Sequence, residues 1–348
     1  MKHFRLTYKT VFFLGIVLFL YSPAYAGVNG QCANCHTMHD SQNGANVGGA
    51  GQSAHLLNDS CIGCHTDSTG SGGNGGTTPF VMQASEPLYN TDTLAGGSFW
   101  WVATSGGGSD AMGHNVLGLS AQDSTLTTAP NGGVVQCGGC HESLAVAQAT
   151  LGGLGSGCEG CHLGVKHHAA SAVAGAVSTE ANGWHRFLAG HNGGVDLNSG
   201  VEGIEDVDWE YSHAAGDHNE YLGVAAGGGL SNNSMTSYCC GCHGEFHDQV
   251  DNGLWIRHPS DAIIPDSGEY AGYTAYDPNT PVARPNLTSI VSTDTVTPGT
   301  DMVMCLSCHR AHGSPYADML RWDYTQQIAG GSGATGTGCF TCHTTKDE

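Results

Sequence analysis

The hydrophobic pattern of this chain is sparse and mostly aperiodic, and its one long apolar run lies near the N-terminus. Residues 11–20 of that run follow a basic segment, residues 2–9, and precede small residues in an A-x-A arrangement at 24–26. This order is typical of a secretory signal peptide, so we expect a leader over 1–26 and a mature start at Gly27. The run is shorter than the ~20 residues of a membrane-spanning helix, and an exported chain without a membrane span is expected.

Beyond residue 26 the pattern predicts only short elements. Cys, Cys and His recur at positions i, i+3 and i+4, which lie on one face of a helix, so a short helix is expected in each such motif. Segments 98–103 and 253–257 are expected to be short strands, and most other residues to be coil. No clean boundary divides the chain, and 27–348 is predicted to be a single domain.

Seven copies of the pentapeptide Cys-x-x-Cys-His account for all but one of the 15 cysteines. Two thiols at this spacing can bond to the two vinyl groups of one porphyrin, and the histidine that follows reaches the iron as its proximal ligand. Paired zinc knuckles would not explain a histidine after every pair, and disulfides would not repeat at one fixed spacing. The motifs therefore predict seven haem c groups. The attachment cysteines are Cys32, Cys35, Cys61, Cys64, Cys137, Cys140, Cys158, Cys161, Cys239, Cys242, Cys305, Cys308, Cys339 and Cys342, and the proximal ligands are His36, His65, His141, His162, His243, His309 and His343.

Composition changes the expected core. The chain holds 54 Gly, and its large apolar side chains are too few for an ordinary core of this length. The haems are therefore predicted to form the core, and the haem-free chain to be largely unfolded. Without the leader, 7 basic residues face 31 acidic ones, a net charge of −24 that argues against nucleic acid or anionic membranes as partners.

The remaining histidines bear on what the irons do. Twelve histidines of the mature chain lie outside the seven motifs, which is enough to give every iron a second histidine ligand. Such ligation saturates the iron and lacks the Met ligand that raises its potential, which favours electron transfer over catalysis. All seven motifs are regular, so an enzyme is not expected.

Three histidines closely follow a proximal ligand: His39, His247 and His312. On a helix, neighbours three or four residues apart project from the same side. The second histidine therefore cannot reach the opposite face of the first one's haem, and must bind a different iron or stay free.

Several stretches carry more specific signals than the motif alone. They are residues 35–39 (Cys-His-Thr-Met-His), 113–116 with 125–130, 235–258, 305–312 and 339–346. In these stretches the chain resembles the outer-surface multihaem cytochromes of the OmcS and OmcE type, which polymerise into conductive filaments. The resemblance implies a coil-rich multihaem cytochrome c with few short helices and strands, an extended subunit, and haems that alternate between parallel and T-shaped stacking.

The resemblance also implies ligands. His39 would cross the subunit boundary, and the haem on Cys305 and Cys308 is the candidate recipient; the histidines that match family distal positions are His114, His247, His258 and His312. Two departures are the seven motifs, where the better-known members have six or four, and the Glu-Ser that follows His141. Segments 166–168 and 217–220 and His191 are the candidates to fill that gap, with His168, His191 and His218 as the predicted ligands.

The resulting interpretation is a self-associating filament subunit at the cell surface that passes electrons to redox partners or extracellular acceptors. A monomeric periplasmic carrier is an alternative in which His39 would bind within its own chain or not at all. A terminal reductase is another, and it would need a five-coordinate haem.

Two smaller features complete the sequence. Cys240 is spare, because a pairing with Cys242 is too short for haem attachment, and we expect a buried thiol rather than an intermolecular bridge. The acidic run 202–210 could hold calcium, but a solvated acidic face is the preferred interpretation.

Overall fold

Short elements joined by coil build this chain, as its aperiodic pattern predicts. The structure, a computed structural model, describes residues 31–39, 41–42, 45–46, 56–67, 78–103, 107–116, 118–121, 123, 125, 157–162, 165–168, 176–190, 199–225, 232–241, 243, 250–251, 254–255, 257–287, 293–331, 333 and 336–347. The predicted leader 1–26, the motif at 137–141, Cys242, His191 and His247 lie outside the described residues.

Helices are confined to single turns or little more. The α-helices are α2 (Cys61–His65), α3 (Met235–Cys240), α4 (Cys305–Cys308) and α5 (Cys339–Cys342). The 3₁₀ turns are η1 (Cys32–Asn34), η4 (Phe99–Trp101), η6 (Asp110–Met112), η7 (Gly157–Gly160), η8 (Glu180–Asn182), η9 (His185–Phe187), η10 (Gly268–Tyr270), η11 (Ala317–Met319) and η12 (Tyr324–Gln326). In the described chain, α2, α4, α5 and η1 lie within attachment motifs, as predicted, while α3 and η7 begin before a motif and overlap it.

The strands are equally short. They are β1 (Ser41–Gln42), β2 (Ala45–Asn46), β3 (Gly203–Ile204), β4 (Glu220–Leu222), β5 (Val250–Asp251), β6 (Leu254–Trp255), β7 (Ala262–Ile263), β8 (Ala283–Arg284) and β9 (Met302–Val303). β1 pairs with β2 and β5 with β6, while the other five form one sheet in the order β3-β4-β8-β9-β7. In that sheet β4 and β8 are parallel, and the other pairs are antiparallel.

The two predicted strand segments have different outcomes. Within 253–257, β6 pairs with β5, so that prediction is confirmed over two residues. The strand predicted over 98–103 is wrong, because this segment forms the turn η4. The Ser98 hydroxyl accepts a hydrogen bond from the Trp100 N–H at 3.1 Å, and this cap favours a helical turn over an extended chain.

Three buried apolar clusters replace a single large core, and an attachment cysteine packs against each. The first cluster joins the sheet to α3 and α4, with Cys239 at its side; its buried members are Val201, Tyr221, Met235, Ala283, Met302 and Met304. Cys342 flanks the second cluster, which contains Ile264, Tyr273, Tyr276, Val282 and Val296, and Cys158 flanks the third, which contains Phe99, Val102 and Val116. Each small cluster thus has a haem-attachment cysteine at its edge.

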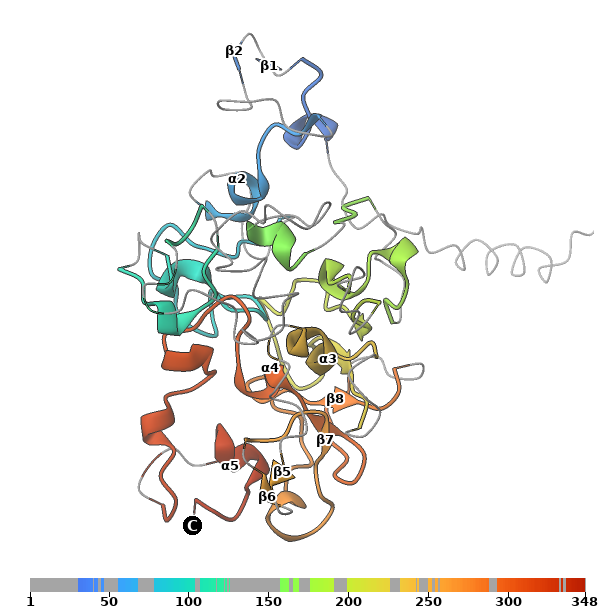
Figure 1. The fold of residues 1–348 in the computed structure, drawn as a ribbon, viewed down its shortest axis with the longest axis vertical. Coiled ribbons are helices and arrows are strands. Elements are labelled where there is room, and N and C mark those ends of the chain that lie inside the picture. Colours follow the sequence, from blue (N-terminus) through green and yellow to red (C-terminus); the bar gives the residue numbers. More distant parts are fainter. Residues whose placement is uncertain are drawn as a thin grey trace, which may run out of the picture.

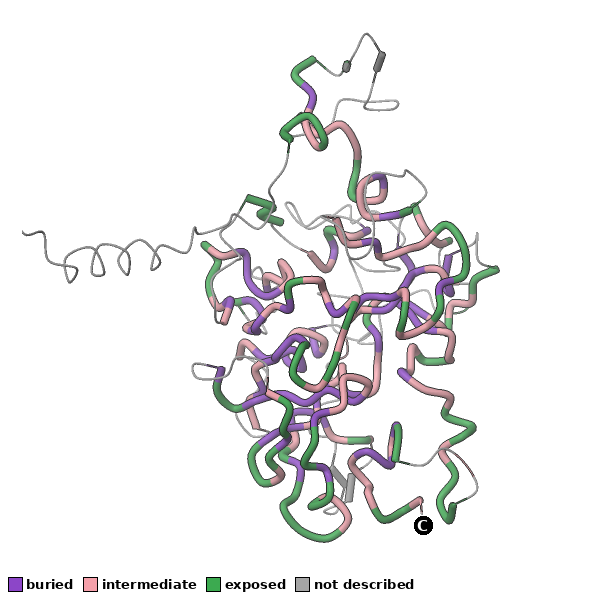
Figure 2. The backbone as a smooth tube through the Cα atoms, turned by 180° about the vertical axis from the view of Figure 1, so that it is seen from behind, coloured by how far each residue is buried: buried purple, intermediate pink, exposed green. Residues whose placement is uncertain are grey.

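The molecule is elongated. Residues 31–46 (blue in Figure 1) project beyond the body at one end of the long axis, and α5 lies toward the other end. Seen from behind in Figure 2, buried residues gather along the middle of the body, whereas the projecting segment is mostly exposed. No helix in the described part of the chain is long and apolar enough to cross a bilayer.

Candidate haem centres

Each described attachment motif folds as a helical turn that fixes the position of its histidine. In five motifs the histidine N–H donates to the carbonyl of the first cysteine, four residues earlier, which closes an α-helical turn. This bond measures 2.8 Å for His36, 2.9 Å for His162, 3.0 Å for His243, 3.1 Å for His309 and 2.9 Å for His343. The two thiols and the imidazole of a motif thus emerge from one turn, as attachment to one porphyrin requires.

Serine side chains start three of these turns. Ser60 caps α2 by accepting from the Gly63 N–H at 3.3 Å, and Ser234 caps α3 by accepting from Ser237 at 3.0 Å. In α4 the hydroxyl of Ser307 instead accepts from the Met304 N–H at 3.0 Å. A cap of this kind stabilises a helix by about 1 kcal/mol, which matters for helices too short to persist alone.

Five pairs of imidazoles face each other at nearly one separation. Every pair joins a histidine of a motif to a histidine that lies outside the seven motifs. The pairs, with their ring-centroid distances, are His36–His168 (6.0 Å), His65–His167 (6.1 Å), His243–His114 (6.2 Å), His162–His312 (6.2 Å) and His343–His258 (6.4 Å).

This separation fits one metal ion between two imidazoles. Bonds of about 2 Å on opposite sides of an ion place the ring centroids about 6 Å apart, since each centroid lies about 1 Å behind its ligating nitrogen. Rings in direct contact are much closer, as for His218 and Tyr276 at 3.6 Å. The five pairs therefore match the spacing of two axial ligands on one haem iron, which carries one electron when the haem is bound.

Hydrogen bonds orient these imidazoles for ligation. Carbonyl and carboxylate oxygens only accept, so they fix the proton on Nδ1 and leave the lone pair of Nε2 for a metal. The Nδ1 contacts are His65 to the Pro79 carbonyl (3.0 Å), His114 to Ala311 (2.7 Å), His162 to Arg186 (2.9 Å), His258 to Pro259 (3.0 Å), His309 to Asp318 (2.7 Å) and His343 to the Glu269 carboxylate (2.9 Å).

Burial keeps several of these imidazoles neutral. It lowers the pKa of His243 to about 4 and that of His312 to about 3, and lowers the pKa of His114, His162 and His309 as well. Metals bind the neutral imidazole, so these groups are in their ligating form at neutral pH.

The attachment motifs also contact one another in sequence. Cys35 lies close to Cys64, and Cys61 is hydrogen bonded to Cys158. The hydroxyl of Tyr238, beside Cys239, donates to the Cys161 carbonyl at 2.6 Å. Cys239 lies beside Cys305, and Cys308 lies near both Cys339 and Cys342. In the described part of the chain these neighbours follow the sequence from the motif at 32–36 to that at 339–343.

Known proteins share these features. Residues 297–348 match the family described as a doubled CXXCH motif. The chain is 25% identical to the C-type cytochrome OmcS of Geobacter sulfurreducens, over 91% of this chain and 84% of that protein. The chain is an OmcS-like multihaem cytochrome. Structures of the Geobacter sulfurreducens outer-membrane cytochrome S filament and of OmcS nanowires align at 19% identity, over 93% of this chain and 93% and 92% of theirs, with TM-scores of 0.48 and 0.44.

Four predicted distal histidines of this OmcS-like cytochrome, His114, His168, His258 and His312, lie opposite a motif histidine. A fifth histidine, His167, lies opposite His65; it belongs to the candidate segment 166–168 but was not selected as a predicted ligand. Its signal was its place next to His168. These two residues form a turn, and their imidazoles lie opposite two different motif histidines, His65 and His36.

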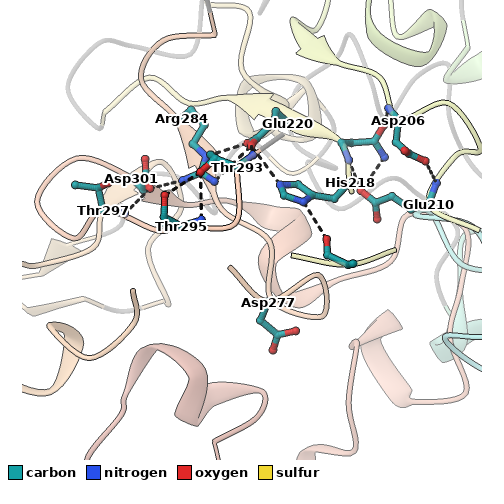
Figure 3. Close-up of polar contacts among 12 residues, drawn as sticks. Asp206, Glu210, His218, Glu220, Asp277, Arg284, Thr293, Thr295, Thr297 and Asp301 are labelled. Atoms are coloured by element: carbon teal, nitrogen blue, oxygen red, sulfur yellow. Dashed lines mark hydrogen bonds and ion pairs between the residues drawn. The ribbon is translucent and has the colours of Figure 1, made fainter. Parts of the chain in front are cut away.

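His218 is different, and its prediction as an iron ligand does not agree with the structure. Its Nδ1 contacts the Ala214 carbonyl and its Nε2 the Glu220 carboxylate, both at 3.2 Å (Figure 3). Its ring stacks on Tyr276. Both nitrogens are occupied by acceptors, so neither faces a metal. The segment 217–220 instead builds a buried ionic network with Arg284.

His309 and His39 each remain without a facing imidazole in the described part of the chain. His309 has the same Nδ1 contact as the paired histidines and is oriented for ligation in the same way. His39 lies exposed on the projecting segment 31–46. Among the described residues, His309 thus has no second histidine ligand opposite it, whereas His39 offers an exposed imidazole.

The two smaller predictions are also resolved. Cys240 is buried, as expected. The acidic run is not a solvated face, because Asp206 and Glu210 are only 8% and 4% exposed. The Asp206 carboxylate accepts from the Glu210 N–H at 2.7 Å, and Glu210 accepts from Asn219 at 2.8 Å. Burial, together with Asp208, raises the pKa of Asp206 to about 6.

Proposed function

We propose that this chain is the subunit of an extracellular filament that conducts electrons through seven covalently bound haems c to external acceptors. The observation that carries the proposal is the set of five imidazole pairs at 6.0–6.4 Å, each with one motif histidine. An iron with two histidine ligands has no position left for a substrate, which suits electron transfer and not catalysis.

The proposed ligands follow these pairs. His168, His167, His312, His114 and His258 are the distal ligands of the haems whose proximal ligands are, in the same order, His36, His65, His162, His243 and His343. Cys137, Cys140 and the proximal ligand His141 lie outside the described part of the chain.

The contacts between motifs support an order for electron passage. In this order an electron moves along the motifs that end at His36, His65, His162, His243, His309 and His343, since consecutive motifs are neighbours. The order follows the sequence, with only the motif at 137–141 left unplaced.

Self-association follows from the two unmatched histidines. His309 is oriented for ligation and lacks a facing imidazole in the described chain, whereas His39 is exposed on a projecting segment. We propose that His39 of one subunit ligates the haem at Cys305 and Cys308 of the next. A head-to-tail contact of this kind does not close, so it generates a filament, and a metal bond makes it directional. The two OmcS structures are described as a filament and as nanowires, which supports the same proposal.

The test is negative-stain electron microscopy of the native haem-loaded protein beside His39→Ala. Filaments are expected for the wild type and discrete particles for the variant, because the variant lacks the ligand that crosses the boundary. Gln31→Ala removes an exposed side chain from the same segment and should leave the filaments intact.

Particles in the wild type as well would reject self-association and favour the monomeric carrier. A high-spin absorbance signal in the wild type would favour a reductase with an open haem.

A further inference from the structure

Three arginines of this acidic protein are almost completely buried: Arg284, Arg310 and Arg321, with 2%, 2% and 3% of their surface exposed. A guanidinium stays charged in proteins, and burying one is costly unless an anion compensates it. Arg284 has that compensation. Its Nε contacts Glu220 at 2.9 Å and its Nη1 contacts Asp301 (Figure 3).

Arg321 has no such compensation. Its Nε donates to the Leu306 carbonyl at 2.6 Å and its Nη1 to the Pro278 carbonyl at 3.2 Å. Its Nη2 is buried and has no hydrogen-bond partner in the described part of the chain. Both acceptors are neutral, and no described carboxylate forms an ion pair with this residue, so its positive charge is left unbalanced.

Arg310 adds a second buried positive charge without a carboxylate partner in the described chain. All of its acceptors are neutral too: the Tyr89 hydroxyl, the Leu94 and Ala95 carbonyls and the Asn90 side chain, at 2.7–3.3 Å. It is close enough to Arg321 for the two charges to repel. Glu210 acts on Arg321 from farther away and opposes this repulsion only in part.

Arg321 lies against one attachment motif, and Arg310 follows the same motif in the sequence. The Arg321 N–H donates to the Cys308 carbonyl at 2.9 Å, and its guanidinium holds Leu306 inside the same motif. Arg310 directly follows His309. No comparable cation is buried unpaired elsewhere in the described chain.

We propose that Arg321, with Arg310, gives the haem at Cys305 and Cys308 the most positive reduction potential of the chain. The inference rests on the proposed function, which places a haem there. A nearby fixed positive charge disfavours the ferric state, which has one more positive charge than the ferrous state, and burial leaves this repulsion weakly screened. One electron passes from a neighbouring haem, which is oxidised as this haem is reduced, and the arginines keep their protons throughout.

The consequence is that the most easily reduced haem lies at the proposed subunit boundary. Electrons would collect on the haem that is shared between two subunits, so this centre would be the first to be reduced in the filament.

The experiment is a spectroelectrochemical titration of the intact haem-loaded protein. Arg321→Gln should move the most positive component to a more negative potential, with the amplitude of a single haem. Arg321→Lys keeps the charge and should retain most of the wild-type potential. Lys166→Gln removes the same charge from a side chain that is 42% exposed and should leave that component in place, because solvent screens it.

The outcomes separate the two proposals. A full haem complement with no shift in Arg321→Gln overturns the inference, as does an equal shift in Arg321→Lys, which would mean that the guanidinium contacts matter and not the charge. A wild-type protein without haem at Cys305 and Cys308, found by mass spectrometry of that peptide, would instead overturn the proposed function.

Discussion

At the scale of single residues, hydrogen bonds to Nδ1 are the most informative feature of this chain. A histidine held through Nδ1 by a main-chain carbonyl keeps Nε2 free and its ring direction fixed. His65 and His162 are held in this way by the carbonyls of Pro79 and Arg186. Because a carbonyl of the main chain needs no particular side chain, this support leaves little trace in the sequence.

His167 gives a direct test of the ligand pairs. In His167→Ala we expect the iron bound by His65 to lose its second axial ligand, because the two rings face each other at 6.1 Å. One haem should change from low spin to high spin, which absorbance and EPR spectra of the purified protein would show. Lys166→Ala alters the preceding, exposed side chain and should leave all haems low spin. A fully low-spin His167→Ala protein would disprove this pair.

At the scale of elements, the five-stranded sheet holds two attachment helices in place with very little structure. Its strands contribute two or three residues each, too few for a stable sheet by themselves. The ionic network of Glu220 in β4, Arg284 in β8 and Asp301 next to β9 ties its three middle strands together. β9 then leads directly into α4, so the network bears on where that motif lies.

We therefore expect Arg284→Met to destabilise the protein by about 3–5 kcal/mol, because it leaves two buried carboxylates without their cation. Chemical denaturation of the haem-loaded protein, followed by circular dichroism, measures this change. Lys346→Met breaks the exposed pair with Glu269 and should cost no more than about 1 kcal/mol. Equal losses in the two variants would contradict the role given to the network.

Sequence patterns predicted the elements that depend on neighbouring residues. They failed for features that depend on contacts between residues far apart in the sequence. The single-turn helices in the motifs were predictable, because Cys and His positions within five residues define them. The distal pairs were not, since His312 meets a motif histidine 150 residues away. His218 was misassigned because nothing near it in the sequence indicates the distant residues that surround it. Arg284 binds Glu220, the carboxylate that contacts His218, and Tyr276 stacks on the His218 ring.

At the scale of the whole molecule, the contacts between motifs form a line and no compact cluster. Figure 1 shows the same elongation, with the first motif at one end of the long axis and the last toward the other. No order of the centres could be predicted from the sequence, whereas the neighbourhood of thiols such as Cys61 and Cys158 supports the order proposed above for the described motifs. In such a line every centre is essential to passage.

Removal of a middle centre tests this arrangement. The double substitution Cys158→Ser and Cys161→Ser should abolish attachment of one haem and reduce the conductance of single filaments to background. Filaments should still form, because His39 and His309 are unchanged. Cys240→Ser alters a buried thiol outside the attachment sets and should conduct normally. Conductance that survives the double substitution would show that electrons bypass this centre.

The adjacent pair His167 and His168 also bears on how the length of this chain can vary. One inserted residue would displace one of the two imidazoles along the chain by about 3.3 Å, which exceeds an iron–nitrogen bond of about 2 Å. Coil ordinarily tolerates insertions and deletions. Here the two ligands fix the number of residues between them, although the segment is coil. Natural changes in loop length should therefore fall on either side of this dipeptide and not within it.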